Sequence, residues 1–275
     1  SLGLTVISHA EDAGLVGGAV ATSSETSTRL GLASAPAEAE AMAISRDLML
    51  AELTGARLHF RKVTTAKGLD LVRMAKAKGM PVTCGISPTH LFLSEVAIND
   101  FRTFARLSPP LRAEGDRRAC IEAVRDGTID VICSAHDPRG PEAKRLPFAD
   151  ADPGAAGAET LLSLSLGLVR DGVVSMERLF ELLSLNPSRL IGVDSGRLEA
   201  GAPADLVFLE SPGNPTLELV DIALVAAHHE RQRARDRALD PARDRRVQLG
   251  ETVVGSQSIH LARVVDRDGR AVDEQ

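Results

Sequence analysis

The sequence predicts an α/β fold in which βα units surround a parallel sheet. Short apolar runs rich in β-forming residues alternate with longer helical patterns, and most of these patterns stop at a glycine. Apolar runs without polar alternation are typical of parallel strands that are buried on both faces. Strands that are separated by helices usually pair in parallel. We count four βα units before this alternating pattern ends.

The strands and helices of these units can be predicted in order along the chain. The strands are predicted at residues 4–8, 57–60, 81–86 and 130–134. The helices are predicted at residues 36–53, 67–78, 116–126, 158–170 and 176–185. The first four helices end at a glycine, which readily adopts the left-handed conformation that closes a helix. The fifth is expected to end at Asn186-Pro187, because proline interrupts helical hydrogen bonding.

The chain divides into three regions. Residues 1–192 hold the βα units. Residues 193–220 contain a turn and the apolar run 206–209, which predicts a segment of a small β domain. The third region, residues 221–275, has ten Arg and ten Asp plus Glu but no Lys and no aromatic residue, and it is left unassigned.

Two interpretations of this tail stay open. Its bias toward Arg, Asp, Ala and His is the kind that a reading-frame shift in a GC-rich gene produces. The alternative is a divergent helix at residues 223–237, followed by a β pair at residues 247–254 and 259–265.

The composition limits the classes of partner. The chain has 32 Lys plus Arg against 38 Asp plus Glu, a formal net charge of -6. An acidic balance gives no general attraction to nucleic acid or to anionic membranes, so we expect neither as a partner. No apolar run is long enough for a membrane span, and no signal-peptide pattern is present. Three cysteines without CxxC spacing fit a reducing compartment, and we expect a cytoplasmic protein.

Polar segments follow the predicted strands, at the edge of the sheet where βα architectures carry function. His9 and its neighbour Glu11 follow the first strand, and the imidazole could bind a metal or simply belong to a solvated loop. Lys62 follows the second strand. Thr64 and Thr65 come next and could do no more than cap the following helix.

Two further segments offer groups for recognition. Arg112 follows the rigid turn Ser108-Pro109-Pro110, and the planar fork of an arginine suits a carboxylate. His136 and Asp137 follow the fourth strand. Each of these residues could equally be a solvated loop residue, so none of them identifies a reaction by itself.

Taken in order, the segments resemble the bacterial class I dihydroorotase family of the amidohydrolase superfamily, from residue 1 to about residue 210. The motifs that support the resemblance are His9-Ala10-Glu11-Asp12, Val63-Thr64-Thr65-Ala66, Ser87-Pro88-Thr89-His90, Ser108-Pro109-Pro110-Leu111-Arg112, Lys144-Arg145-Leu146-Pro147-Phe148-Ala149, the run from Gly154 to Thr160, Asn186-Pro187, and the run from Gly201 to Val207.

The resemblance implies the carboxyl-terminal half of a (β/α)8 barrel with part of a small β domain. Residues 1–192 would hold strands five to eight of the family's barrel. Four strands cannot close an eight-stranded barrel, so we expect a preceding half of roughly 150 residues. A dimer that completes the barrel is the alternative, and we expect a homo-oligomer.

The resemblance also implies an activity and a cofactor. The family interconverts N-carbamoyl-L-aspartate and dihydroorotate in pyrimidine synthesis, and zinc is its expected cofactor. His9 matches a metal ligand of the family's strand five. Lys62 stands in place of a metal-binding histidine, and Ala135 stands in place of the catalytic aspartate of strand eight. The positions implied to bind substrate are Ser108, Arg112, His136 and Gly154.

The two replacements predict a degraded metal site. A lysine ammonium repels a divalent cation unless burial removes its proton, and alanine has no ligand oxygen. Asp137 lies two residues beyond Ala135, roughly 6.5 Å along an extended chain, so it cannot simply take over the role. We therefore expect the chain to lack a complete zinc site and to be catalytically inert as it stands.

Three functional hypotheses stay open. The first is a working dihydroorotase with a small-molecule substrate, which requires bound metal. The second is a noncatalytic dihydroorotase homologue that is an assembly partner of aspartate transcarbamoylase. The third is another cyclic-amide hydrolase, such as a hydantoinase or allantoinase, although residues 108–112 and 144–148 look more like dihydroorotase.

Overall fold

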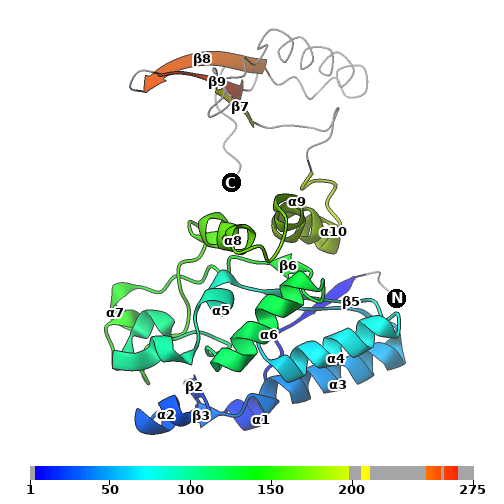
Figure 1. Ribbon diagram of the computed structural model, residues 1–275, viewed down its shortest axis with the longest axis vertical. Helices are drawn as coiled ribbons and strands as arrows, with labels where there is room; N and C mark the ends of the chain where they lie inside the picture. Colours follow the sequence, from blue (N-terminus) through cyan, green and yellow to red (C-terminus); the bar gives the residue numbers. More distant parts are fainter. Residues whose placement is uncertain (1–3, 198–205, 211–245, 255–256, 266–275) are drawn as a thin grey trace. The chain divides into compact units, whose positions relative to one another are not determined.

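Four short parallel strands form the sheet at the centre of the first part of the chain. They are β1 (Thr5–Ser8), β4 (Arg57–Phe60), β5 (Val82–Ile86) and β6 (Val131–Ile132), in the spatial order β1-β4-β5-β6 (Figure 1). Each strand pairs in parallel with its neighbour. The predicted α/β class with a parallel sheet is therefore confirmed.

The computed structural model describes residues 4–197, 206–210, 246–254 and 257–265. The chain divides into two units, residues 1–197 and residues 198–275, which are described one after the other. The finer boundaries expected from the sequence, at residues 192 and 220, stay predictions.

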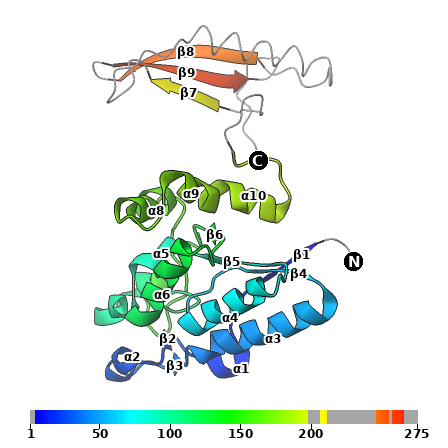
Figure 2. The ribbon, with the colours of Figure 1, turned by 45° about the vertical axis from the view of Figure 1, so that its right-hand side comes forward.

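Three helices connect the successive strands of the sheet. They are α3 (Glu38–Thr54), α4 (Ala66–Ala77) and α6 (Glu114–Arg125). Helices α3 and α4 lie side by side along one face of the sheet in both ribbon views (Figures 1 and 2). Their apolar side chains join those of the strands in one core, and its fully buried members include Ile44, Phe60, Leu69 and Ile86. Burial of these side chains fixes the positions of the strand ends.

The ends of these helices follow signals that the sequence contains. Gly55 closes α3 in the left-handed conformation, with a φ of 67°. Thr65 caps α4, because its hydroxyl accepts a hydrogen bond of 3.1 Å from the backbone nitrogen of Gly68. Capping is thus an observed role of Thr65.

A second group of helices lies away from α3 and α4. It comprises α8 (Leu161–Arg170), α9 (Met176–Phe180), one π-helical turn (Glu181–Leu185) and α10 (Asn186–Ile191) (Figure 2). The expectation that the helix ends at Asn186-Pro187 is wrong. Pro187 lies in the first turn of α10, where a missing backbone donor costs little, and the wider π turn precedes it.

The polar segments after the strands contain short elements that the sequence analysis did not predict. They are α1 (Ala13–Val16), β2 (Ala21–Thr22), α2 (Glu25–Arg29), β3 (Ser34–Ala35), α5 (Pro88–Phe92), the 3-10 turns Glu95–Phe101 and Thr103–Ala105, and α7 (Pro141–Lys144). A second apolar cluster, which includes Val20, Ile98, Leu107 and Phe148, packs these segments together. The loops therefore form an ordered layer at the carboxyl ends of the strands.

Strand β1 is an edge of the sheet. Among the described residues it pairs only with β4. Leu4, Val6 and Ile7 are exposed, although runs of this kind are normally buried in a parallel sheet. This open apolar edge agrees with the expectation that four strands leave the sheet unclosed.

The second unit contains a small antiparallel sheet. Its strands are β7 (Leu206–Glu210), β8 (Arg246–Val254) and β9 (Gln257–Val265), in the order β7-β9-β8. The β pair proposed for the tail appears as β8 and β9. The helix proposed at residues 223–237 lies outside the described residues.

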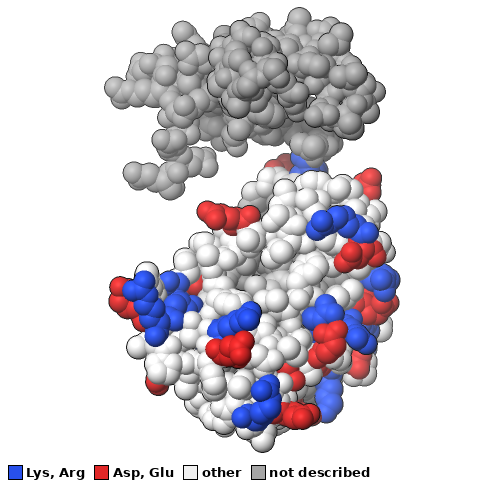
Figure 3. Space-filling view, turned by 60° about the vertical axis from the view of Figure 1, so that its left-hand side comes forward, with Lys and Arg blue, Asp and Glu red and all other residues white. Residues whose placement is uncertain are grey.

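Charged side chains of both signs are intermixed on the face drawn in Figure 3, which presents no broad area of one sign. Several described pairs are neighbours on a helix, such as Arg117 with Glu114 at 2.6 Å. Exposed pairs of this kind contribute little to stability. In the parts of the chain that the structure describes, no helix combines the length and the apolar character that crossing a membrane requires.

Candidate functional site

Three of the predicted site residues meet at the carboxyl ends of the strands. His9 follows β1, Lys62 follows β4, and Ser108 comes from the segment after β5. The Ser108 hydroxyl lies 3.2 Å from Nε2 of His9. The Lys62 ammonium donates a hydrogen bond to the backbone carbonyl oxygen of Ser108. Ser108 therefore links the two positions that the family resemblance assigns to metal binding.

Glu11 completes this group. Its Oε2 lies 2.7 Å from Nε2 of His9 and accepts a hydrogen bond of 3.0 Å from the Ser108 hydroxyl. Burial raises the pKa of Glu11, but the bonds from His9 and Ser108 and the charge of Arg112 outweigh burial, so the net pKa is lowered. On the other side of the ring, Nη2 of Arg61 lies 3.4 Å from Nδ1 of His9. Both imidazole nitrogens thus contact protein groups.

Lys62 is enclosed by the protein, with 7% of its surface exposed. Burial is the largest cause that lowers its pKa, and the neighbouring Arg61 lowers it further. Cys133, Glu11 and Asp137 act in the opposite direction without reversing the shift. A buried amine with its hydrogen bond to a carbonyl is thus found at the position to which the family resemblance assigns an imidazole ligand.

Position 135, in the loop after β6, has no side chain that could bind a metal. Ala135 has a φ of 47°, the left-handed region that favours glycine and is rare for alanine. Asp137, the nearest carboxylate along the chain, forms an ion pair of 2.7 Å with Arg139.

Two of the three positions that the resemblance assigns to the metal site and its chemistry do not fit zinc. Zinc sites need three or four histidine, cysteine or carboxylate donors around one point. No group of three such side chains is found in the described ranges. His9 is the one matched donor, Lys62 brings a positive charge, and Ala135 brings a methyl group.

His136 and Gly154 lie in a second group, formed by the loop after β6. Nδ1 of His136 accepts hydrogen bonds from the backbone nitrogens of Gly157 and Ala158, at 3.2 and 3.1 Å. Gly154 has a φ of 131°, and a Cβ atom there would come within 2.4 Å of the Asp137 carbonyl oxygen. The glycine is required by this close approach whether or not substrate binds nearby.

Arg112 lies in a buried network. It is 4% exposed, and its guanidinium donates to the hydroxyls of Thr64 and Thr22 at 2.9 and 3.1 Å. Its Nη2 is 3.5 Å from Oε2 of Glu40. Three of its polar contacts are thus to the protein, and substrate binding by Arg112 stays a prediction.

Glu40 is the residue that the sequence analysis missed. It lies in the first turn of the alanine-rich helix α3 and is fully buried. Its carboxylate accepts hydrogen bonds from the backbone nitrogens of Thr64 and Thr65, at 2.9 and 2.8 Å, and from both hydroxyls. Glu40 therefore holds the turn that directly follows Lys62. The Thr64-Thr65 pair signals a capped helix, but nothing local in the sequence identifies its acidic partner.

His90 supports the segment that contains Ser108 through a contact with Pro109. Its Nδ1 lies 2.7 Å from the Ser87 hydroxyl, and its Nε2 lies 3.0 Å from the carbonyl oxygen of Pro109. Burial, helped by the charge of Lys62, lowers the pKa of His90 to about 3. The ring is therefore neutral at physiological pH and has a positioning role.

A cavity of about 660 Å³ opens beside the second group, at Gly154, and its volume is within the range of pockets that hold small molecules. Its wall includes Phe101, Arg139, Lys144 and Gly154. The Lys144 ammonium is already bound by backbone carbonyl oxygens, including that of Asp152 at 2.8 Å.

The chain is similar to known proteins along most of its length. The sequence profile described as Amidohydrolase family matches residues 33–234. A dihydroorotase-like protein of Pseudomonas aeruginosa is 41% identical over 211 residues, which are 77% of this chain and 50% of that protein. A dihydroorotase of Geobacter metallireducens is 40% identical over 222 residues, 81% of this chain and 52% of that one. The chain thus spans about half the length of the curated relatives it matches.

Solved structures give the same fold. An L-hydantoinase (dihydropyrimidinase) from Arthrobacter aurescens matches with a TM-score of 0.66 and 27% identity, over 75% of this chain and 48% of that one. A D-hydantoinase (dihydropyrimidinase) from Thermus sp. matches with a TM-score of 0.65 over 99% of this chain and 59% of that one, and at 21% identity this likeness shows the fold alone. The predicted partial TIM barrel and the resemblance to dihydroorotases are confirmed. The roles of the individual site residues stay predictions.

Proposed function

Because this chain belongs to the amidohydrolase family, we propose that it is the carboxyl-terminal half-barrel of a dihydroorotase-like protein of pyrimidine synthesis, and that it does not catalyse the metal-dependent reaction. One observation supports the second part above all others. The Lys62 ammonium is buried and hydrogen-bonded to the Ser108 carbonyl, at the position to which the family resemblance assigns a metal-binding histidine.

The chemistry of ring opening explains why this replacement matters. Hydrolysis of a cyclic amide needs an activated water and a group that accepts and returns a proton. His9 is engaged by Glu11 and Ser108. Position 135 has no carboxylate, and Asp137 is paired with Arg139. The described residues therefore supply neither the ligand set nor the proton acceptor.

A second candidate function is that of a noncatalytic assembly partner of aspartate transcarbamoylase. It is favoured by the contrast between the two kinds of residue at the site. The buried side chains of Glu40, Arg112 and His90, which support the loops of the site, all have hydrogen-bond partners. By contrast, positions 62 and 135, which the resemblance assigns to metal binding and proton transfer, carry other residue types. A protein that is selected only to assemble needs the residues that support the fold but not those that bind metal or transfer a proton.

The experiment that tests the proposal is dihydroorotate hydrolysis by the purified, complete gene product with zinc in excess. We expect turnover no higher than that of a His9→Ala variant prepared in parallel. Hydantoin is assayed alongside to test the hydantoinase alternative. Turnover of either substrate above the His9→Ala level would show that the pocket recruits ligands other than those identified here, and the proposal of inactivity would be wrong.

The assembly role has a separate test. The gene product is mixed with purified aspartate transcarbamoylase from the same organism and analysed by size-exclusion chromatography with light scattering. A stable complex supports the assembly role. Independent elution at micromolar concentrations of both proteins contradicts it.

A further inference from the structure

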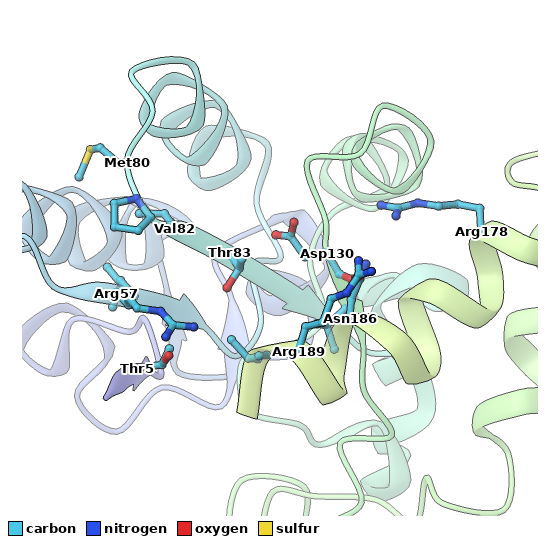
Figure 4. A pocket seen from close by; sticks show the side chains of 13 residues that line it. Thr5, Arg57, Met80, Val82, Thr83, Asp130, Arg178, Asn186 and Arg189 are labelled. Atoms are coloured by element: carbon cyan, nitrogen blue, oxygen red, sulfur yellow. The ribbon is translucent and has the colours of Figure 1, made fainter. Parts of the chain in front are cut away.

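The first unit has open surface on both sides of its sheet. The cavity drawn in Figure 4 lies on the inner side, between the strands and α10, where the sequence predicts a further half of the barrel. The outer sides of α3 and α4 face away from it, and no described element of the first unit runs along them (Figures 1 and 2). A half that completes the barrel pairs with the edge strands β1 and β6, whereas α4 follows the inner strand β4. Completing the barrel therefore leaves this outer side open.

Four large apolar side chains lie on this outer side, with 54% to 81% of their surface exposed. They are Met42, Met49 and Leu53 on α3, and Met74 on α4, and we call them the outer patch. The three residues of α3 are separated by seven and four positions, a spacing that keeps them on one face of the helix. Buried residues such as Ile44 lie on its other face, toward the core.

Leu50 is also exposed but belongs to a different flank of α3. It lies three residues after Asp47, which accepts a hydrogen bond of 2.6 Å from the Ser8 hydroxyl of β1. That flank faces the edge strand, where a further half of the barrel would cover it. Leu50 is therefore not included in the outer patch.

The outer patch is continuous across the two helices. Two ion pairs join α3 to α4, Lys67 with Glu38 at 2.5 Å and Lys78 with Glu52 at 3.7 Å. Met74 lies between these two lysines along α4, and Met49 lies between these two glutamates along α3. Both methionines thus lie on the stretch where the helices are joined, and one surface contains them.

The neighbouring helix α6 has a different outer side. Its exposed residues are charged, with Arg118 paired to Glu114 and Arg125 paired to Glu122. Helix α3, by contrast, has apolar residues on both faces. A helix that is apolar all round is normally buried all round. This difference indicates that the outer patch is a surface for assembly and not an ordinary solvated side.

We propose that the outer patch is the contact surface between two copies of this chain. Twofold-symmetric dimers are the commonest soluble oligomers, and in them the same surface of each copy packs against itself. Methionine suits such a contact, because its flexible, unbranched side chain fills irregular gaps beside another side chain. This dimer differs from one that completes the barrel, which would use the edge strands.

The charges around the outer patch fit a second copy. Its rim includes three cations and three anions, all more than half exposed: Arg46, Lys67, Lys78, Glu38, Glu52 and Asp70. Two copies of a balanced rim bring equal numbers of both charges to the contact, so they do not repel each other. A nucleic acid or an anionic membrane would meet the three anions, so this rim does not favour either of them.

The size of the surface agrees with a dimer of ordinary area. A standard interface buries about 800 Å² on each copy, with an apolar centre and a polar rim. The largest apolar patch of a typical monomer covers about 300–600 Å², and four large side chains that are each more than half exposed are on the order of this size. The outer patch thus supplies the centre of such an interface, and the charged residues supply its rim.

Sedimentation velocity of the purified, complete gene product at increasing micromolar concentrations tests this proposal. We expect the wild type to dimerise as its concentration rises. Met49→Glu and Met74→Glu should each raise the dissociation constant by about tenfold or more, because the dimer would then bury an unpaired charge. Val96→Glu is the matched control, since it changes a similarly exposed apolar residue in the loop layer, and it should leave the dissociation constant unchanged.

A mixture of two charged variants tests whether the second copy is the partner. Met49→Glu and Met49→Lys should each be mainly monomeric, and mixing them should restore association, because surfaces of opposite charge then meet. If the Met49 variants fail to fold by circular dichroism, Met74→Glu and Met74→Lys provide the same test from the other helix.

Three outcomes would overturn the proposal. The first is a wild type that stays monomeric at the highest concentration. The second is a dissociation constant that neither Met49→Glu nor Met74→Glu changes, and the third is a mixture no more associated than its components. If a monomeric wild type binds aspartate transcarbamoylase and Met49→Glu does not, the outer patch belongs to that contact instead. None of these outcomes depends on whether the chain hydrolyses dihydroorotate.

Discussion

Arg112 and Glu40 form an ion pair inside the protein, with Nη2 of the arginine 3.5 Å from Oε2 of the glutamate. The two side chains are 4% and 0% exposed. Glu40 belongs to α3, and Arg112 follows the Ser108 turn, so the pair joins the helix after β1 to the loop after β5. The turn that follows Lys62 is bound between them through Thr64.

Arg112→Ala should be strongly destabilising. Removing one partner of a buried pair leaves the other charge buried without compensation, which costs about 3–5 kcal/mol. Urea denaturation at neutral pH measures the loss. Arg125→Ala is the matched control, because Arg125 and Glu122 pair at the surface, with 49% and 55% of their side chains exposed, and its loss should cost about 1 kcal/mol or less. Similar losses in the two variants would mean that the buried pair does not stabilise the loop layer.

Lys62→Met should stabilise the protein at neutral pH. The pKa of Lys62 is lowered in the folded state, chiefly by burial, whereas an unfolded lysine has a pKa of about 10.4. Below the folded pKa, the folded protein holds a buried charge that the unfolded chain exposes to water. Methionine removes this penalty, and we expect a gain of about 1 kcal/mol in the free energy of unfolding.

The pH dependence of that gain provides the sharper test. The unfolded chain binds the extra proton between the two pKa values, so the stability of the wild type rises with pH in that window. The advantage of Lys62→Met should therefore shrink as the pH approaches about 10. Lys78→Met serves as a control at an exposed lysine. A constant loss of stability in Lys62→Met at every pH would show that the hydrogen bond to Ser108 outweighs the cost of burial.

His90 predicts a loss of stability in acid. Its pKa is lowered to about 3 in the folded protein, mainly by burial, and an unfolded histidine has a pKa of about 6.5. Between these values only the unfolded chain takes up the proton, so stability falls as the pH decreases from about 6.5, by up to about 1.4 kcal/mol for each pH unit. Denaturation curves measured across this range should have a smaller pH slope in His90→Gln than in the wild type. Equal slopes would assign the acid sensitivity to other groups.

The parallel sheet could be predicted because its signals are local. The strand predicted at residues 57–60 coincides with β4, and Gly55 closes α3 as the sequence indicates. The helix through Pro187 could not be predicted, because the π turn before it depends on tertiary packing. At the site, the strand ends point to His9 and Lys62, and the family resemblance adds Ala135. They do not identify Glu40, because its arginine partner is 72 residues away and its helix looks like any alanine-rich helix.

Restoring the family's side chains should restore metal binding if the rest of the pocket is intact. We expect the double variant Lys62→His, Ala135→Asp of the complete gene product to retain more zinc after dialysis than the unchanged protein, measured by plasma mass spectrometry. The histidine replaces a cation with a neutral donor. The aspartate is suited to position 135, because aspartate tolerates the left-handed conformation that Ala135 adopts better than most residues do.

The control for that experiment lies within the same site. His9→Ala in the double-variant background should abolish the gain in zinc, because His9 is the one matched donor that the described residues contain. Lys62→His alone should give a smaller gain, since position 135 still lacks an oxygen. If the double variant binds no more zinc than the unchanged protein, the prediction is wrong. In that case His9 stays bound to Glu11 and Ser108, and two substitutions are not enough to rebuild the metal site.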